Sequence, residues 1–166
     1  NAYFTDKAAA IQNLVRSINT YAKDENGQPR KLIDGVGMQG YIGGYGTQSG
    51  CLVNSHLQQI KTAIQRYEAE GLKVQITEMA VRNYKEDLAH EHAVFYQKLF
   101  KVFKSINRDA EKPILTNVAI WGMVDNPYDH SGSYSYKMNG THGGLFGYGC
   151  KVKEAFILVH EELAAD

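Results

Sequence analysis

The sequence of 166 residues lacks several features that would assign it to a particular class of protein. Its two cysteines, Cys51 and Cys150, match no metal-binding spacing, and its six histidines form no HExxH-type pattern, so we expect no metal site. There is no run of about 18 apolar residues that could span a membrane. Lysine and arginine (18) balance aspartate and glutamate (18), so neither nucleic acid nor an anionic membrane is indicated as a partner.

Two further absences leave questions open. The sequence has no signal peptide, and it begins with Asn1 and not with a methionine, so it reads as a processed or excised piece. The two cysteines can form one disulfide in an exported protein or remain two thiols, and their spacing does not decide between these states. The length is sufficient for one domain with a hydrophobic core.

Tyrosine and glycine, in contrast, are abundant, with 11 and 16 residues. Both gather in the stretches "GYIGGYGTQSG" and "HSGSYSYKMNGTHGGLFGYG". Loops of this composition on a rigid scaffold suit the recognition of a polar ligand that has flat apolar faces. Sugars fit that description, although many other ligands do as well.

The hydrophobic pattern predicts strands and helices in alternation. Four such strand-helix units indicate an α/β protein with a parallel sheet and helices packed outside it. The opening "NAYF" can be the end of the first strand. The other strands are expected at residues 32–40, 73–77 and 116–121, and the helices at 6–23, 55–70, 88–106 and 151–163.

The stretch "KVQITEMAVR" places Glu78 at the C-terminal end of an apolar, β-branched strand. A glutamate at a solvated strand end is common, and this is the simpler explanation of its position. However, parallel α/β sheets bind their ligands at the C-terminal ends of the strands, and the unusual loops follow Gln39, Glu78 and Trp121. These three residues are therefore candidates for a functional site.

Four units are too few for a closed barrel, which typically needs roughly 250 residues. Half of a barrel would leave two hydrophobic sheet edges without partners. We therefore expect a missing partner, which is either an N-terminal half-barrel or a second copy of the chain. A complete flavodoxin-like sheet is the alternative, but no phosphate-binding glycine loop precedes a helix here.

The motifs "IDGVGMQG", "VQITEMAV" and "VAIWGMVD", in this order, resemble the last four strands of glycoside hydrolase family 10, the endo-1,4-β-xylanases. The resemblance extends over essentially the whole sequence. It implies that residues 1–166 are a single partial catalytic domain, the C-terminal half of a (β/α)8 TIM barrel. It also implies hydrolysis of internal β-1,4 linkages in xylan with retention of configuration.

The resemblance assigns the role of nucleophile to Glu78, the glutamate of the "TE" pair. A retaining glycosidase also needs a second carboxyl group that protonates the leaving oxygen. In the family this acid/base glutamate ends the fourth strand in an "NE" motif, which this sequence lacks. We therefore expect it in the missing N-terminal half, and we expect the isolated chain to hydrolyse xylan poorly.

Other candidate residues follow from the same resemblance as substrate-binding groups. Gln39 matches a glutamine that hydrogen-bonds in the sugar site, and Trp121 matches the aromatic floor under the sugar. Asn1 and Tyr3 correspond to an "NDY" motif in which Ala2 replaces the aspartate. Simpler explanations are a polar strand end for Gln39 and a core position for Trp121.

The sequence departs from the family pattern at two paired positions. The family usually has a histidine two residues after the strand-six glutamine and an aspartate two residues after the nucleophile, whereas Tyr41 and Ala80 stand here. A tyrosine hydroxyl can still donate to Glu78 without titrating near neutral pH, so Tyr41 is included in the sugar site. A second tryptophan is also missing, and its stacking role is open among Tyr128, Tyr134 and Tyr136.

The sequence therefore predicts a secreted, extracellular endo-1,4-β-xylanase that acts on xylan or xylo-oligosaccharides and needs no cofactor, because carboxylates and hydrogen bonds handle the chemistry. Two alternatives are a related β-1,4-glucanase and an inactive xylan-binding protein. The sequence does not reveal whether the pocket admits the extra hydroxymethyl group of glucose, nor the oligomeric state.

Overall fold

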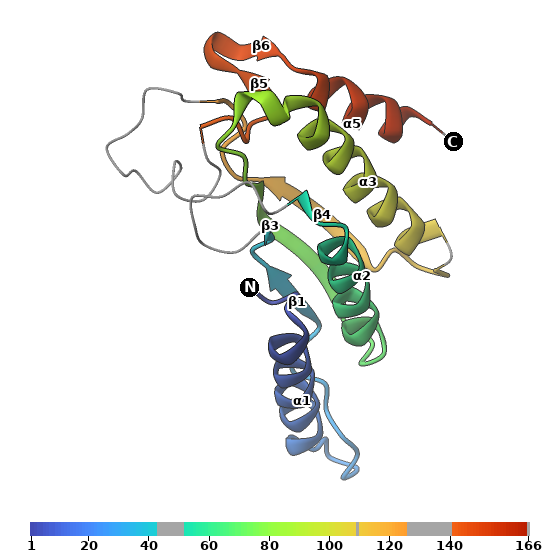
Figure 1. Ribbon diagram of the computed structural model, residues 1–166. Helices are drawn as coiled ribbons and strands as arrows, with labels where there is room; N and C mark the ends of the chain where they lie inside the picture. The colour runs from blue at the N-terminus through green and yellow to red at the C-terminus, as the bar shows by residue number, and fades with distance from the viewer. Residues whose placement is uncertain (43–51, 109, 126–140, 166) are drawn as a thin grey trace.

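The structure is a computed structural model that describes residues 1–42, 52–108, 110–125 and 141–165. Helices and strands alternate along the chain, as the sequence predicts, and the helices lie along one side of the sheet in Figure 1. None of the described helices is long and apolar enough to cross a membrane. In chain order the elements are α1 (Thr5–Tyr21), β1 (Gly35–Met38), β2 (Tyr41–Ile42), α2 (Ser55–Glu68), β3 (Lys73–Val81), the 3-10 helix η2 (Glu86–Leu88), α3 (Ala89–Arg108), β4 (Leu115–Ile120), β5 (Phe146–Gly147), the 3-10 helix η3 (Tyr148–Cys150), β6 (Lys151–Val152) and α5 (Glu154–Ala164).

The strand β3 lies at the centre of a parallel sheet. The strands β1 and β2 pair with it on one side, and β4 pairs with it on the other. The expectation of a parallel sheet is therefore confirmed. The separate pair β5–β6 is antiparallel, and it takes up residues 151–152, which the sequence analysis had placed in the last helix.

The expected first strand, "NAYF", is not a strand in the structure. Its backbone forms a turn, in which the N–H of Phe4 donates to the C=O of Asn1 at 3.3 Å, and α1 begins directly afterwards. The physical reason is that the side chains of Asn1 and Tyr3 are directed to the backbone of β2, so this segment contacts the sheet through side chains. The expectation of four complete strand-helix units is wrong in this respect.

The two faces of β3 differ sharply. Val74 and Ile76 are buried under the helices, whereas Lys73, Gln75 and Thr77, which alternate with them, are exposed. Parallel sheets normally have both faces covered. The exposed face therefore indicates that the described residues are part of a larger fold. We call the two sides of the sheet the covered face and the open face.

The helices form the covered face through residues at helical spacing. The helix α3 contributes the most to the core, with Phe95, Leu99, Phe103 and Ile106 all nearly inaccessible to solvent. These residues lie in the segment 88–106 in which the sequence predicts a helix, and that helix is confirmed. Phe100 and Phe103 add an edge-to-face pair, with their ring centroids 5.6 Å apart.

A buried ion pair fixes the chain after β4. Asp125 accepts hydrogen bonds from the Lys153 Nζ at 2.9 and 3.1 Å and from the N–H of Gly144 at 2.8 Å. Lys153 also donates to the C=O of His142 at 2.9 Å. Lys153 directly precedes α5, so the pair ties the end of the sheet to the last helix.

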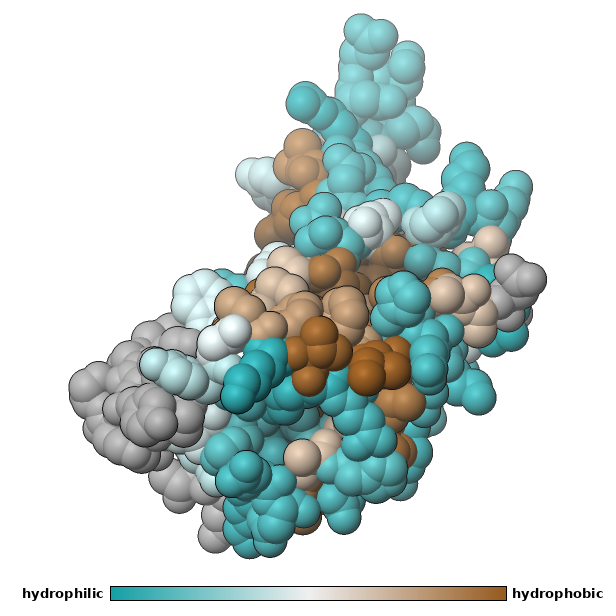
Figure 2. Space-filling view, turned by 90° about the horizontal axis from the view of Figure 1, so that it is seen from above, coloured by the Kyte–Doolittle hydropathy of each residue, from teal (hydrophilic) through white to brown (hydrophobic). Residues whose placement is uncertain are grey.

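Apolar side chains also reach the surface. Figure 2 shows hydrophobic residues gathered in the middle of the face seen from above, with hydrophilic residues around them. On β6 and α5 the exposed apolar residues are Val152, Ile157 and Leu163. Scattered exposed apolar residues are ordinary, but a group of them marks a surface that another segment can cover.

Candidate active site

Glu78 owes its position to a register shift in β3. Against β4, Ile76 pairs with Val118 and Met79 with Ile120, so three steps along β3 correspond to two steps along β4. Such an extra residue reverses the alternation of side chains beyond it. As a result, Met79 joins Ile76 in the main core, and Glu78 leaves the face that strict alternation would give it.

The neighbouring strand shows the same extra residue. Met38 pairs with Ile76 and Tyr41 with Ala80, so three steps on that side correspond to four along β3. Tyr41 and Ala80 form a buried cluster of their own, separate from the main core that contains Met79. Glu78 lies two residues from Ala80, on the same side of the strand, and it is half-buried.

Gly40 makes the break between β1 and β2 possible. Its φ is +84°, a conformation that favours glycine, and a Cβ there would lie 2.6 Å from Cγ2 of Ile76. Because the backbone turns at this point, the C=O of Gln39 accepts from the N–H of Glu78 at 2.9 Å. The turn at Gly40 therefore places Gln39 and Tyr41 on either side of the register shift.

The Tyr41 hydroxyl donates a hydrogen bond to Oε2 of Glu78. The Tyr41 side chain is 1% exposed and Ala80 is fully buried, which leaves the ring a defined place beside the carboxylate. The expectation that a tyrosine hydroxyl at this position reaches Glu78 is confirmed.

Asn1 and Tyr3 lie behind Tyr41. The Asn1 side chain donates to the C=O of Tyr41 and accepts from the N–H of Gly40 at 3.2 Å. The Tyr3 hydroxyl contacts the same carbonyl at 3.2 Å, and it also lies 3.3 Å from Nδ1 of His56. Both residues therefore support the β2 backbone near Glu78, and their role as direct sugar ligands stays a prediction.

Gln39 and Trp121 flank Glu78 from the two neighbouring strands. Gln39 is exposed, and its backbone is bonded to Glu78 as described above. Trp121 directly follows β4, and its N–H donates to the C=O of Met79 at 2.8 Å. The Trp121 side chain is 37% exposed, so the alternative of a core tryptophan does not apply. The structure thus brings together the residues that the sequence selected.

Sequence reasoning missed two histidines near the site. His56, on α2, meets Tyr3, and burial lowers its pKa. His92, at the start of α3, is fully buried, and its Nε2 lies 2.8 Å from the C=O of Val81. Burial lowers the pKa of His92 to about 4, so the ring is neutral near pH 7 and Nε2–H is the donor. The only signal in the sequence that could have indicated their burial is that apolar residues flank both histidines.

His90 and His92 point in opposite directions because they are two residues apart on a helix. His90 is exposed and pairs with Glu154 of α5 at 2.9 Å, whereas His92 faces the sheet. No group of three or more histidine, cysteine, aspartate or glutamate side chains that could hold a metal ion is found among the described residues.

Several residues considered above cannot be placed. Tyr128, Tyr134 and Tyr136, the candidates for the second stacking aromatic, lie outside the described residues. So does Cys51, whereas Cys150 is described and exposed. Cys150 is a free thiol in the structure, and the choice among the three tyrosines stays open.

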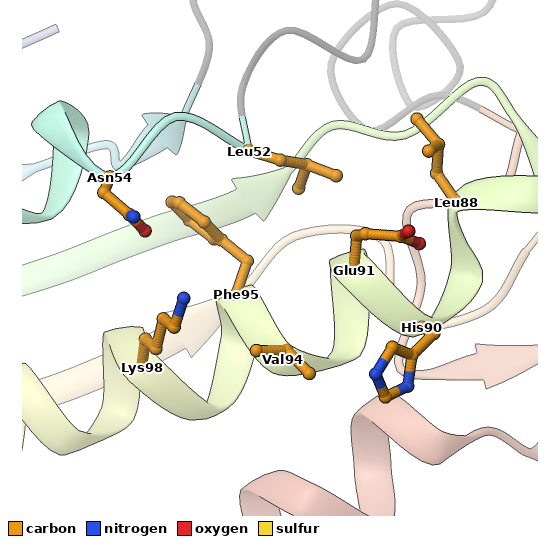
Figure 3. A pocket seen from close by; sticks show the side chains of 8 residues that line it. All are labelled: Leu52, Asn54, Leu88, His90, Glu91, Val94, Phe95 and Lys98. Atoms are coloured by element: carbon orange, nitrogen blue, oxygen red, sulfur yellow. The ribbon is translucent and has the colours of Figure 1, made fainter.

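A pocket of about 480 Å³ lies between α3 and the segment before α2 (Figure 3). It is formed by the segment before α2 and by one side of α3, with Leu52 and Phe95 in its apolar part. Among the described residues that line it, Glu91 is the one carboxylate, and Glu78 does not line it. The pocket therefore lacks the pair of carboxyl groups that glycoside hydrolysis requires.

Comparison with known sequences adds a family match. A sequence profile described as Glycosyl hydrolase family 10 matches residues 1–162. Endo-1,4-beta-xylanase B of Butyrivibrio fibrisolvens is 26% identical over 139 residues, which are 82% of this chain and 20% of that protein. Exoglucanase XynX of Acetivibrio thermocellus is 30% identical over 123 residues, which are 72% of this chain and 9% of that protein. The chain thus spans a fifth or less of these two relatives.

Solved structures of other proteins resemble this chain in fold. The native structure of CbXyn10B superposes with a TM-score of 0.67 at 23% identity and covers 96% of this chain and 46% of that one. TsXylA, an intracellular xylanase from Thermoanaerobacterium saccharolyticum, superposes with a TM-score of 0.61 at 26% identity and covers 92% of this chain and 39% of that one. The chain therefore spans less than half of each solved structure.

Proposed function

This chain belongs to glycosyl hydrolase family 10, and we propose that it is the C-terminal half of the catalytic barrel of an endo-1,4-β-xylanase. The fold is part of a (β/α)8 barrel, as the superposed structures indicate. The open face of the sheet then corresponds to the barrel interior, and the C-terminal ends of β1 to β4 correspond to the end of the barrel that carries the active site.

The observation that carries the proposal is the environment of Glu78. The register shift in β3 turns this carboxylate away from the main core, and Tyr41 donates to its Oε2. Trp121, partly exposed at the end of the next strand, offers an aromatic surface on which a sugar ring can stack. A carboxylate in this setting suits attack on an anomeric carbon and has no evident role in packing.

In the proposed reaction, Oε1 of Glu78 attacks the anomeric carbon and forms an ester bond. The bond to the leaving oxygen breaks with its electron pair, and a second carboxylic acid protonates that oxygen. Water then attacks the same carbon, gives its proton to that second group, and releases Glu78 as a carboxylate. We place the second carboxyl group in the N-terminal half of the barrel.

The partner that completes the barrel is proposed from the uncovered parts of the structure. The open face and the outer edge of β4 carry no covering element among the described residues. The exposed Leu163 borders a groove lined by Phe103, Leu115 and Val118, where α3, β4 and α5 meet. An N-terminal half-barrel would cover these surfaces, and self-association of two chains is the alternative.

A second substrate class is favoured by one relative, which is named an exoglucanase. Xylose and glucose units differ in a hydroxymethyl group, so the comparison of aryl xylobioside and aryl cellobioside hydrolysis decides between them. We expect the xylobioside to be the better substrate, and a preference for the cellobioside would assign the barrel to β-1,4-glucans.

We also propose that the protein acts outside the cell, because xylan is a polymer that does not enter cells. One structural relative is an intracellular xylanase, and an intracellular location is therefore the alternative. Activity against polymeric xylan in the culture medium, compared with the cell lysate, is the measurement. Activity confined to the lysate would contradict the proposal.

The experiment that tests the nucleophile is intact mass after incubation with a 2-fluoro-xylobioside bearing an activated leaving group. This compound needs no acid catalyst, so Glu78 can react before the second carboxyl group is supplied. We expect one glycosyl unit on the peptide that contains Glu78, first on the chain alone and then with the N-terminal half-barrel added. Labelling of another residue, or none in the completed barrel, would contradict the proposal.

A further inference from the structure

Tyr41 is held beside Glu78 by close packing on one side. Its ring is buried against Ala80, with which it pairs across β2 and β3, and these two residues form their own cluster. Glu78 and Ala80 lie on the same side of β3, two residues apart. A ring seated on Ala80 and extending along that side brings its hydroxyl to the carboxylate, as observed.

The backbone of Tyr41 is held from the other side by the N-terminal segment. The Asn1 amide group bridges the two-residue segment Gly40–Tyr41, because it donates to the carbonyl of Tyr41 and accepts from the N–H of Gly40. The Tyr3 hydroxyl, fully buried, provides a further contact to the same carbonyl. The position of the Tyr41 ring is therefore fixed both through its backbone and through its side chain.

We infer that Tyr41 is the positioning residue of the Glu78 carboxylate and that Ala80 is small in order to admit it. The inference rests on the proposed function for the identity of the nucleophile. Within the described residues, Tyr41 is the one side chain that hydrogen-bonds Glu78, and it engages Oε2. One carboxylate oxygen is thus tied to the protein, which leaves Oε1 as the oxygen for attack in the proposed reaction.

The hydrogen bond has unequal effects on the two chemical steps. In the first step, the carboxylate loses its charge as the ester forms, so the bond contributes orientation. In the second step, Glu78 leaves as a carboxylate, and a donor to Oε2 stabilises the returning charge. Loss of the hydroxyl should therefore slow release of the sugar from Glu78 more than its attachment.

The first test compares Tyr41→Phe with Tyr67→Phe in the completed barrel. Tyr67 is also fully buried, and its hydroxyl donates to the C=O of Ala2 at 2.6 Å, so the control loses a buried hydrogen bond of a similar kind. We expect Tyr41→Phe to release the 2-fluoro-xylobiosyl group roughly 10- to 100-fold more slowly, the effect of one hydrogen bond to a charged group. With an aryl xylobioside, kcat and KM should fall together, because the glycosyl-enzyme accumulates.

Ala80→Val provides a second variant that leaves the hydroxyl in place. Two added methyl groups would displace the buried ring, so this variant should resemble Tyr41→Phe in its slow release of the sugar. The double variant should be little slower than either single one, because both remove the same contact. Release rates for Tyr41→Phe that equal those for Tyr67→Phe would overturn the inference.

A spectroscopic comparison separates this inference from the proposed function. The side-chain carboxyl resonance of Glu78, assigned with Glu78→Gln, is recorded by carbon-13 NMR in the chain. Tyr41→Phe should shift this resonance, and Tyr67→Phe should leave it in place. An unchanged resonance in Tyr41→Phe would overturn the inference even if xylan is hydrolysed. Conversely, a shift without any labelling of Glu78 would support the contact and reject the xylanase assignment.

Discussion

The nine residues of β3 are divided between the covered face and the open face, and different forces organise the two faces. On the covered face, Val74, Ile76 and Met79 are buried in the main core, where apolar area removed from water supplies the stability. On the other side of the strand, Glu78 is placed by one hydrogen bond and a small packed cluster. The comparison suggests that substitutions on the covered face change stability and that those near Glu78 change activity.

The largest expected effect comes from Glu78→Gln. The amide keeps the shape of the side chain but cannot act as nucleophile, so hydrolysis in the completed barrel should fall by at least roughly a thousand-fold. Xylo-oligosaccharide affinity should survive. The measurements are the rate on an aryl xylobioside, and binding by calorimetry. Substantial hydrolysis by Glu78→Gln would contradict the expectation that substitutions near Glu78 change activity.

On the covered face, Ile76→Ala should lower the free energy of unfolding by about 2–5 kcal/mol, because it leaves a cavity under the helices. The neighbouring Thr77→Ala, on the open face, should change it by roughly 0.5 kcal/mol or less. Urea unfolding of both variants, followed by circular dichroism, provides the comparison. Similar losses for both would mean that the open face is packed as tightly as the covered one.

His92 should make the stability of the folded chain depend on pH. Its pKa is lowered from 6.5 to about 4 in the folded chain, so the unfolded chain binds more protons between these values. Stability from this group is complete above about pH 6.5 and is lost as the pH falls toward 4, by roughly 3 kcal/mol in total. His92→Gln should flatten that part of the pH profile, measured as denaturant midpoints.

Apart from the control variants, Gly40→Ala should have the smallest effect. An alanine at φ +84° is strained, and its Cβ would meet Ile76, so the free energy of unfolding should fall by about 1–3 kcal/mol. Because Gly40 directly precedes Tyr41, which donates to Glu78, the release rate of the 2-fluoro-xylobiosyl group should also decrease. Gly27→Ala is the control, since its φ is +75° but no atom lies near its Cβ. Equal losses of unfolding free energy in Gly40→Ala and Gly27→Ala would mean that the positive φ, and not the contact with Ile76, causes the whole effect.

Much of this molecule is predictable from the sequence. The helices follow from apolar residues at a period of 3.6, and Glu78, Gln39 and Trp121 were selected because each ends a strand. The turn at Asn1 to Phe4 was missed, because a short apolar stretch before a helix has the same pattern whether or not a strand pairs with it.

The contacts within the site were predictable only in part. The substitution of Tyr41 and Ala80 at paired positions indicated that they would meet, and they do. The support from Asn1 and Tyr3 was not predictable, because it depends on a side-chain amide that bonds a backbone 40 residues away. The same holds for His92, whose role depends on the C=O of Val81 at the end of β3.

The register shift between Ile76 and Met79 makes the number of residues in β3 as important as their identity. Up to Ile76 the residues of β3 in the main core are even-numbered, and from Met79 they are odd-numbered, while the buried Ala80 belongs to the separate cluster with Tyr41. Removal of the extra residue between Ile76 and Met79 would give one alternation throughout, and Met79 would still face the core, but Glu78 would lose the irregular backbone that places it. Point substitutions in β3 alter one side chain each, whereas a one-residue deletion elsewhere in the strand would turn every side chain beyond it to the opposite face. This strand should therefore tolerate varied amino acids over evolution while its number of residues stays constant.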